Sequence, residues 1–178
     1  MIDLSGDVLD VARRMLGWRV TTVLDGEPTA VMLTEVEAYR GDQDPASHAY
    51  RGRTRRNASM FGEAGTLYVY RSYGIHWCMN VVVGAPGTAH AVLMRGGIPV
   101  DGQDAMERRR GREDHITDGP GKLCQALAVT GAHDGTSLRD GPVRLTPATL
   151  PPGWTIEATP RIGIAKATHR HWRLVALP

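Results

Sequence analysis

The chain has 178 residues and a mass of 19.4 kDa, the size of one ordinary domain, so we expect a single domain over residues 1–178. Hydrophobic residues make up 42% and charged residues 22% of the sequence, which argues against disordered and fibrous classes. A net charge of +2 excludes attraction to polyanions through overall charge alone. Any contact with nucleic acid must therefore be local.

The N-terminal part predicts a helix followed by a β-hairpin. Apolar residues at positions 8, 11, 12 and 15 form a helical stripe that follows Ser5, the expected cap, and ends at Gly17. Runs rich in Val, Thr and Leu over 18–24 and 29–39 flank an Asp25–Gly26 turn, which is typical of two antiparallel strands. Residues 40–65 are polar with weak periodicity and predict a long functional loop with one short helix.

The rest of the chain predicts more strands with flanking helices. Runs over 66–73, 76–83 and 89–95 are separated by glycine-containing turns and indicate a meander. A charged segment and a segment that begins with proline predict helices at 101–110 and from 120 onwards. Short strands are expected at 143–145, 154–158 and 161–164. Because strands dominate, we expect an α+β fold with a mainly antiparallel sheet flanked by helices.

The two cysteines and the absence of long apolar runs indicate where in the cell the protein is expected. Cys78 and Cys124 lie far apart, without a paired spacing or a third thiol that could build a metal site. We expect both thiols to be buried and reduced. No window approaches 18 consecutive apolar residues. We therefore expect a soluble cytoplasmic protein that does not enter the membrane.

Two carboxylates mark the end of the strand over 29–39. The period of two places Glu35, Glu37 and Tyr39 on one face of this otherwise apolar strand. The pattern fits a chemical role and fits equally a solvated strand end, since charged residues are mostly exposed. His48 follows nine residues after Tyr39, and a single histidine is more often structural than catalytic.

Tyrosines cluster in the central part of the chain, where three of the five tyrosines fall within six positions. Tyr68 and Tyr70 share one face of their strand, and Tyr73 lies at the hairpin tip beside Gly74. Packing over a helix would explain the first two, but an exposed tyrosine at a tip is harder to explain in that way. Asn80 interrupts an apolar run and needs a hydrogen-bond partner, either the sheet backbone or a ligand.

Arginines are concentrated in two short stretches, at positions 51–56 and 108–112, each containing four. Such runs are usually solvated faces, but in a chain of low net charge they also form patches able to bind phosphates. Residues 119–122, Gly-Pro-Gly-Lys, add backbone amides at a helix start. The spacings of histidines and cysteines do not support a zinc site.

Several ordered blocks of the sequence resemble the 3-methyladenine DNA glycosylase family, also called the alkyladenine glycosylases. The blocks keep the family's order and spacing over nearly the whole chain. They are Thr34-Glu35-Val36-Glu37-Ala38-Tyr39, Ser47-His48, Arg56-Asn57-Ala58-Ser59-Met60-Phe61, Gly65-Thr66-Leu67-Tyr68-Val69-Tyr70, Tyr73-Gly74, Cys78-Met79-Asn80, Leu93-Met94-Arg95, Gly119-Pro120-Gly121-Lys122-Leu123-Cys124-Gln125-Ala126-Leu127 and Arg161-Ile162-Gly163-Ile164.

The resemblance implies a monofunctional DNA glycosylase with a curved antiparallel sheet, a protruding β-hairpin that inserts into DNA, and no metal or organic cofactor. It places Glu37 where the family has the general base that activates water for attack on C1′ of the sugar. The residues that fall in the family's pocket for the flipped base are Tyr39, His48, Tyr70 and Asn80, of which Asn80 disfavours the 2-amino group of normal guanine.

The resemblance also implies a set of DNA contacts. Tyr73 matches the minor-groove wedge that fills the space left by the flipped base. Arg95 matches an arginine that contacts DNA near the flipped nucleotide, and Arg56, Met60 and Lys122 match further backbone and groove contacts. The partner is DNA with damaged purines, expected to be double-stranded, and we expect the protein to be a monomer.

The expected reaction is hydrolytic excision of alkylated or deaminated purines, the class of 3-methyladenine, 7-methylguanine, hypoxanthine and ethenoadenine, which leaves an abasic site for base excision repair. The chain contains only two lysines, which agrees with a water nucleophile rather than an amine. One alternative is a damage-sensing protein that binds the minor groove without catalysis. Another is a small-molecule hydrolase that uses Glu35, Glu37 and His48.

Overall fold

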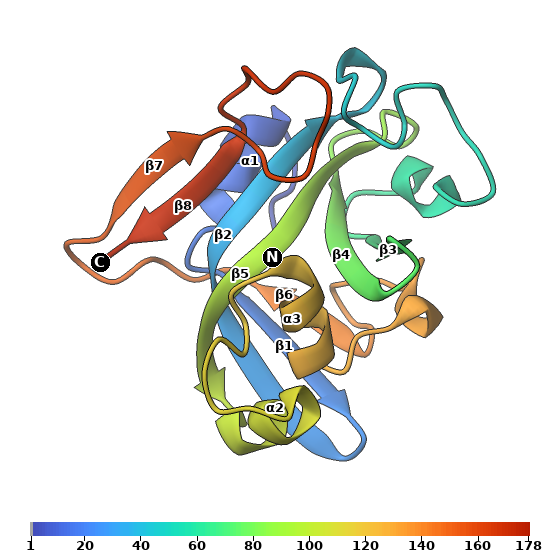
Figure 1. Cartoon of the computed structure of the whole chain (residues 1–178). Helices are drawn as coiled ribbons and strands as arrows, with labels where there is room; N and C mark the ends of the chain where they lie inside the picture. The colour runs from blue at the N-terminus through green and yellow to red at the C-terminus, as the bar shows by residue number, and fades with distance from the viewer. Residues whose placement is uncertain (1) are drawn as a thin grey trace.

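The computed structural model describes residues 2–178, which form a curled antiparallel sheet with three α-helices (Figure 1). The strands are β1 (Arg19–Leu24), β2 (Glu27–Arg40), β3 (Leu67–Ser72), β4 (His76–Val83), β5 (His90–Asp101), β6 (Val143–Thr146), β7 (Thr155–Thr159) and β8 (Arg173–Leu177). The helices are α1 (Val8–Met15), α2 (Gln103–Arg110) and α3 (Pro120–Ala126), with short 3-10 helices at Gly41–Gln43, Ala58–Phe61 and Gly131–His133. The predicted α+β class is confirmed.

The long strand β2 organises the sheet. One edge of β2 pairs with β5, and the sheet continues through β4 to β3, so the predicted meander is confirmed. The other edge is divided: β1 pairs with the first half of β2, and β8 pairs with Glu35, Val36 and Glu37. In Figure 1 the β7–β8 hairpin projects from this second half of β2. The C-terminal part of the chain therefore reaches the strand that carries both carboxylates.

Helix α1 covers the sheet through an apolar stripe. Val8, Val11, Ala12 and Met15 are all buried, as the period of the sequence predicts. The cap is Asp7, whose carboxylate accepts a hydrogen bond from the Leu9 amide at 2.9 Å. The expectation that Ser5 caps the helix was wrong, because the helix begins at residue 8 and only the residue just before it can reach the free amides.

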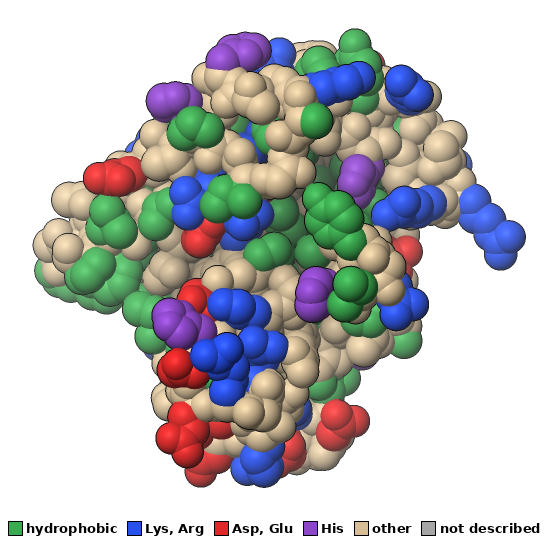
Figure 2. All heavy atoms as spheres, in the orientation of Figure 1, with side chains coloured by type: hydrophobic (Ala, Val, Ile, Leu, Met, Phe, Trp, Pro, Cys, Tyr) green, Lys and Arg blue, Asp and Glu red, His purple; other side chains and the backbone are tan. Residues whose placement is uncertain are grey.

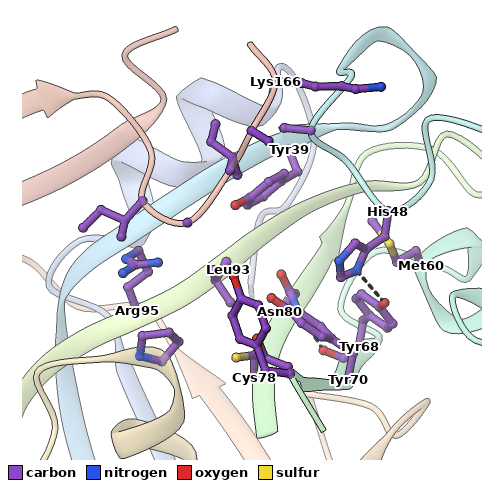
Figure 3. A pocket seen from close by; sticks show the side chains of 18 of the residues that line it. Tyr39, His48, Met60, Tyr68, Tyr70, Cys78, Asn80, Leu93, Arg95 and Lys166 are labelled. Atoms are coloured by element: carbon purple, nitrogen blue, oxygen red, sulfur yellow. Dashed lines mark hydrogen bonds between the residues drawn. The ribbon is translucent and has the colours of Figure 1, made fainter. Parts of the chain in front are cut away.

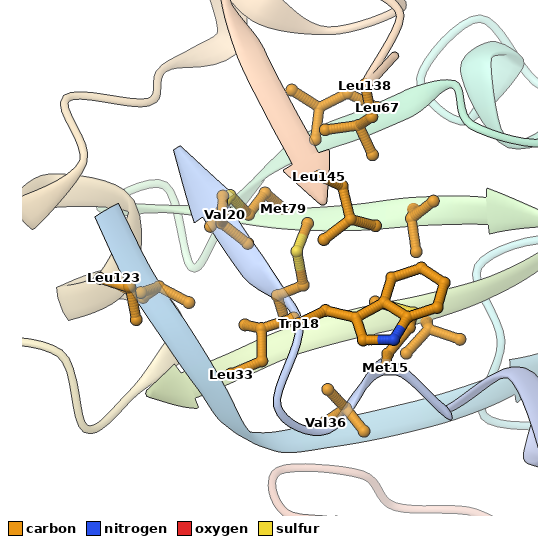
Figure 4. Close-up of a cluster of buried hydrophobic side chains, with 14 of the residues drawn as sticks. Met15, Trp18, Val20, Leu33, Val36, Leu67, Met79, Leu123, Leu138 and Leu145 are labelled. Carbon is orange, nitrogen blue, oxygen red and sulfur yellow. The ribbon is translucent and has the colours of Figure 1, made fainter. Parts of the chain in front are cut away.

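The main core lies on one face of the sheet, where alternate residues of each strand meet α1 and α3. It contains Val36 of β2, Met79 of β4 and Leu67 of β3, together with Met15 of α1 and Leu123 of α3. Figure 4 shows these side chains packed together, with the Trp18 ring at one side. Both cysteines are buried and free, as expected.

The intervening residues of the same strands point to the opposite face. There a second, smaller apolar cluster gathers Tyr68 of β3, Val82 of β4 and Ala91 of β5 with Met60 from the long loop. The tyrosines, Asn80 and the carboxylates of β2 thus share the face that is not filled by the main core.

Two predicted strands differ from the structure, and strand β8 was not predicted. Strand β5 continues past Arg95 to Asp101, and Gly96 and Gly97 lie where its register against β2 shifts. The two strands approach so closely there that a Cβ on Gly97 would lie 2.3 Å from the Met32 carbonyl oxygen, which explains the glycine. Residues 161–164, expected as a strand, form a loop instead. Hydrogen bonds from Arg161 and Ile162 to other segments hold this loop, as described below.

Candidate active site

A cavity of about 570 Å³ opens on this second face of the sheet. Strands β3, β4 and β5 supply its floor, and the loops at 45–60 and 162–166 supply its walls. Figure 3 shows side chains from these segments converging on the cavity, and Figure 2 shows Lys and Arg side chains on several sides of the molecular face drawn there. Its lining includes Tyr39, His48, Arg56, Met60, Tyr68, Tyr70, Tyr73, Cys78, Asn80, Leu93, Arg95, Ile162 and Lys166.

Aromatic rings form one side of the cavity. The Tyr68 and Tyr70 rings are stacked with centroids 5.6 Å apart, and the His48 ring meets the Tyr70 ring edge-on at 4.5 Å. His48 Nδ1 and the Tyr68 hydroxyl are hydrogen-bonded at 3.0 Å. Burial raises the pKa of both tyrosine hydroxyls, so they stay protonated. Burial and the charge of Arg56 lower the pKa of His48, which favours the neutral ring.

Asn80 lies on the floor of this cavity with only 4% of its surface exposed. Its amide nitrogen donates to the Tyr68 carbonyl oxygen at 3.2 Å. The sequence left open whether the sheet backbone or a ligand bonds to Asn80, and the structure shows a hydrogen bond to the backbone of the neighbouring strand. The neighbouring Cys78 also lines the cavity, and burial raises the pKa of its thiol.

Glu37 lies directly behind the cavity wall and is fully buried. The Ile162 amide donates to its Oε1 at 2.8 Å, and the Tyr39 hydroxyl donates to its Oε2 at 2.8 Å. Arg95 Nη1 lies 3.3 Å from Oε1. These three residues line the cavity, so the carboxylate is one layer beneath the surface that a ligand would touch. The solvated strand end that the sequence allowed is excluded for this residue.

A network of charges continues from Glu37 along the sheet. Arg95 Nε donates to Glu35 Oε1 at 2.8 Å, and Arg173 of β8 donates to the same oxygen at 2.6 Å. Burial acts to raise the pKa of Glu35, but the two guanidinium groups outweigh it and hold the pKa below its ordinary value. Glu35, Glu37 and Tyr39 therefore share one face of β2, as predicted.

A buried ion pair holds the two loops that wall the cavity. The Arg161 and Asp44 side chains have no exposed surface, and Arg161 Nη2 donates to Asp44 Oδ1 at 2.9 Å. Arg161 also donates to the Ala38 carbonyl oxygen at 3.0 Å, and its guanidinium carbon lies 4.6 Å from the centroid of the Tyr39 ring. The pair thus ties the loop before His48 to the residue that precedes Ile162.

The β3–β4 hairpin tip lies at the rim of the cavity. Tyr73 and Gly74 have φ angles of 49° and 69°, and the Ile75 amide closes the turn onto the Ser72 carbonyl oxygen at 3.0 Å. A left-handed conformation is uncommon for tyrosine, and Tyr73 is 86% exposed. Its exposure agrees with a partner outside the chain, although insertion into DNA stays a prediction.

The other predicted DNA contacts lie in different surroundings. Arg56 lines the cavity and donates to the Arg71 carbonyl oxygen at 3.1 Å. Arg95 and Met60 are 8% and 2% exposed and both line the cavity wall, so contact of either residue with DNA stays a prediction. Lys122 lies outside the cavity lining on α3, where it pairs with Asp118 at 3.0 Å.

Sequence reasoning did not assign site roles to Asp44, Arg161, Ile162 and Arg173. Asp44 and Arg161 are separated by 117 residues, so no local spacing connects them. The block beginning at Arg161 carries a usable signal, but its apolar composition predicts a strand. Within residues 2–178, no group of three or more His, Cys, Asp or Glu side chains could hold a metal, and no helix is long and apolar enough to cross a membrane.

Comparisons with known proteins show which family the chain belongs to. The sequence profile of the methylpurine-DNA glycosylase family matches residues 3–177. A protein of Rhodopseudomonas palustris, provisionally named 3-methyladenine DNA glycosylase, is 49% identical over 93% of this chain and 80% of its own. Proteins of the same name from Frankia casuarinae and Methanoculleus marisnigri are 50% and 48% identical, over 93% and 90% of this chain and 82% and 85% of their own. The chain therefore belongs to the methylpurine-DNA glycosylase family of enzymes, which hydrolyse N-glycosidic bonds in DNA.

Proposed function

We propose that this enzyme flips alkylated purines out of DNA into the described cavity and hydrolyses their N-glycosidic bond with Glu37 as the general base. The observation that carries the proposal is the placement of Glu37, a buried carboxylate held by three residues that all line an aromatic cavity. The proposed product is an abasic site. Neither an amine nucleophile nor a metal enters the proposed reaction.

The first step is extrusion of the nucleotide from the stack, which costs a few kcal/mol and costs least for a damaged base. Stacking on an aromatic ring returns about 1 to 3 kcal/mol per base. Tyr70 and Tyr39 stand at the cavity surface and supply such rings. The exposed Tyr73 at the hairpin tip would fill the space that the base leaves in the duplex.

The second step is cleavage, in which the bond between C1′ and the purine breaks and the sugar gains positive charge. An ionised Glu37 would stabilise that charge and accept a proton from the attacking water. In the structure the Tyr39 hydroxyl donates a hydrogen bond to Glu37 Oε2, the oxygen that would otherwise accept the proton from water. We therefore propose that the lesion, by stacking on Tyr39, shifts this ring and opens Oε2 to the water.

Selectivity for alkylated purines follows from charge. Methylation at N3 or N7 makes the purine cationic, and a cation over a tyrosine face gains about 0.5 to 2 kcal/mol that a neutral base does not gain. The same charge makes the base a better leaving group. Neutral lesions such as hypoxanthine and ethenoadenine lack this attraction and must also gain a proton or a hydrogen bond as they leave, so we expect slower excision of these bases.

Single-turnover release of free 3-methyladenine and 7-methylguanine from methylated duplex DNA tests the proposal. The wild-type enzyme should release base, and Glu37→Gln should lower the rate by about 100-fold or more while lesion binding stays within a few-fold. Gln keeps the size of the side chain and one carbonyl oxygen for the Ile162 amide. Excision by Glu37→Gln at the wild-type rate would disprove the general-base role, and lesion binding without release by the wild type would favour the damage-sensing alternative.

A further inference from the structure

Glu35 has no place in the aromatic cavity, yet it is the centre of a charge network. Its Oε1 accepts hydrogen bonds from both Arg95 Nε and Arg173 Nε, at 2.8 Å and 2.6 Å. The Glu35 side chain keeps only 18% of its surface exposed, and Arg95 keeps 10%. These contacts are shielded from solvent, so the charges act on one another more strongly than surface ion pairs do.

The network is balanced in charge. Glu35 and Glu37 contribute two negative charges, and Arg95 and Arg173 contribute two positive charges. Loss of the Glu35 charge would leave two guanidinium groups and one carboxylate. An excess positive charge would then stand beside the sugar at the moment when the sugar itself becomes cationic.

Glu35 also fixes the orientation of Arg95. The guanidinium group presents Nε to Glu35 and leaves Nη1 3.3 Å from Glu37 Oε1, a looser contact than the one with Glu35. Without Glu35, the Arg95 guanidinium could rotate and form a tighter, bidentate ion pair with the Glu37 carboxylate. Such a pair would occupy the carboxylate oxygens that the reaction needs.

We propose that Glu35 is a positioning residue for base excision, which holds Arg95 away from a full ion pair with Glu37 and cancels its positive charge. Arg173, carried to the site by β8, completes the balance by neutralising Glu35 in turn. This inference rests on the proposed function, because it concerns the same carboxylate.

Two variants test the charge balance. Glu35→Gln leaves an excess positive charge, and we expect single-turnover release of 7-methylguanine to slow by about tenfold or more, with lesion binding changed by less than about threefold. Glu35→Gln combined with Arg173→Gln restores a net charge of zero. The double variant should therefore release 7-methylguanine about threefold or more faster than Glu35→Gln, although it has lost more hydrogen bonds.

The matched control is Glu27→Gln on the same strand, which breaks ion pairs with Arg108 and Arg109 outside the cavity and should leave excision unchanged. A double variant as slow as Glu35→Gln, or slower, would overturn the proposed charge balance. Both variants carry Glu35→Gln, so a folding defect from that change cannot produce a recovery. Failure of the proposed function would be recognised separately, because the wild-type enzyme would then release no base or Glu37→Gln would release it at the wild-type rate.

Discussion

The Asp44–Arg161 pair offers a quantitative test of what holds the cavity together. Asp44→Asn removes the negative charge from a pair in which both side chains have no exposed surface. Removing one partner of a buried pair costs about 3 to 5 kcal/mol of folding free energy, because the remaining charge is left in a poorly solvated site. The Asn carbonyl oxygen can still accept from Arg161 Nη2 and from the Ala46 amide. The Asn amide nitrogen would replace the oxygen that accepts from Arg161 Nη1 and would set donor against donor, so we expect a loss of about 3 to 5 kcal/mol.

Equilibrium urea denaturation followed by tryptophan fluorescence measures this loss. The matched control is Asp7→Asn, which breaks the more exposed pair with Arg40 and keeps the cap of α1, and which should cost less than about 1 kcal/mol. Asp44→Asn should also slow base excision, since Arg161 precedes Ile162, whose amide holds Glu37. If Asp44→Asn costs no more than Asp7→Asn, the ion pair does not anchor the two loops and the reasoning is wrong.

Three further predictions follow from the site. Burial acts to raise the pKa of Asp44, but the Arg161 guanidinium outweighs it and holds the pKa below its ordinary value. The ionised Asp44 therefore stabilises the fold above about pH 4, and this contribution is lost as the pH falls through the lower folded-state pKa. Measurement of the free energy of unfolding over an acid titration should show the loss. Tyr73→Ala should weaken lesion binding by about tenfold in fluorescence anisotropy, and leave the free energy of unfolding within about 0.5 kcal/mol because the ring is exposed. Asn80→Ala should raise guanine release from undamaged DNA in a single-turnover assay, and unchanged release would exclude Asn80 as the discriminating residue.

The periodicity of the strands predicted much of the fold and the placement of the pocket residues. Alternation of two faces was sufficient to group Glu37 with Tyr39 and Tyr68 with Tyr70. The structure places the three tyrosines in one cavity and Glu37 directly behind its wall. The Asp25–Gly26 hairpin could be predicted because Asp-Gly favours a tight turn in which both residues have positive φ, and the structure has φ angles of 54° and 73° there.

Long-range contacts could not be predicted in the same way. Arg161 reaches Asp44, and Arg173 reaches Glu35, across more than a hundred residues, and nothing in the spacing of either arginine identifies its partner. The segment at 161–164 has the composition of a strand, but its amide at Ile162 bonds to a side chain rather than to a neighbouring strand. Its conformation is therefore set by tertiary contacts and not by local preference.

The pairing of β8 with β2 has a consequence for how the enzyme matures on the ribosome. Arg173 joins Glu35 across a sequence separation of 138 residues, and the amide of Ala38 is bonded to the carbonyl oxygen of Trp172 at 2.8 Å. Contacts of such separation form late, because the entropy of closing a long loop must be paid first. A nascent chain that has not yet emerged past residue 173 should thus carry a sheet whose acid–arginine centre stays incomplete until translation of this segment is finished.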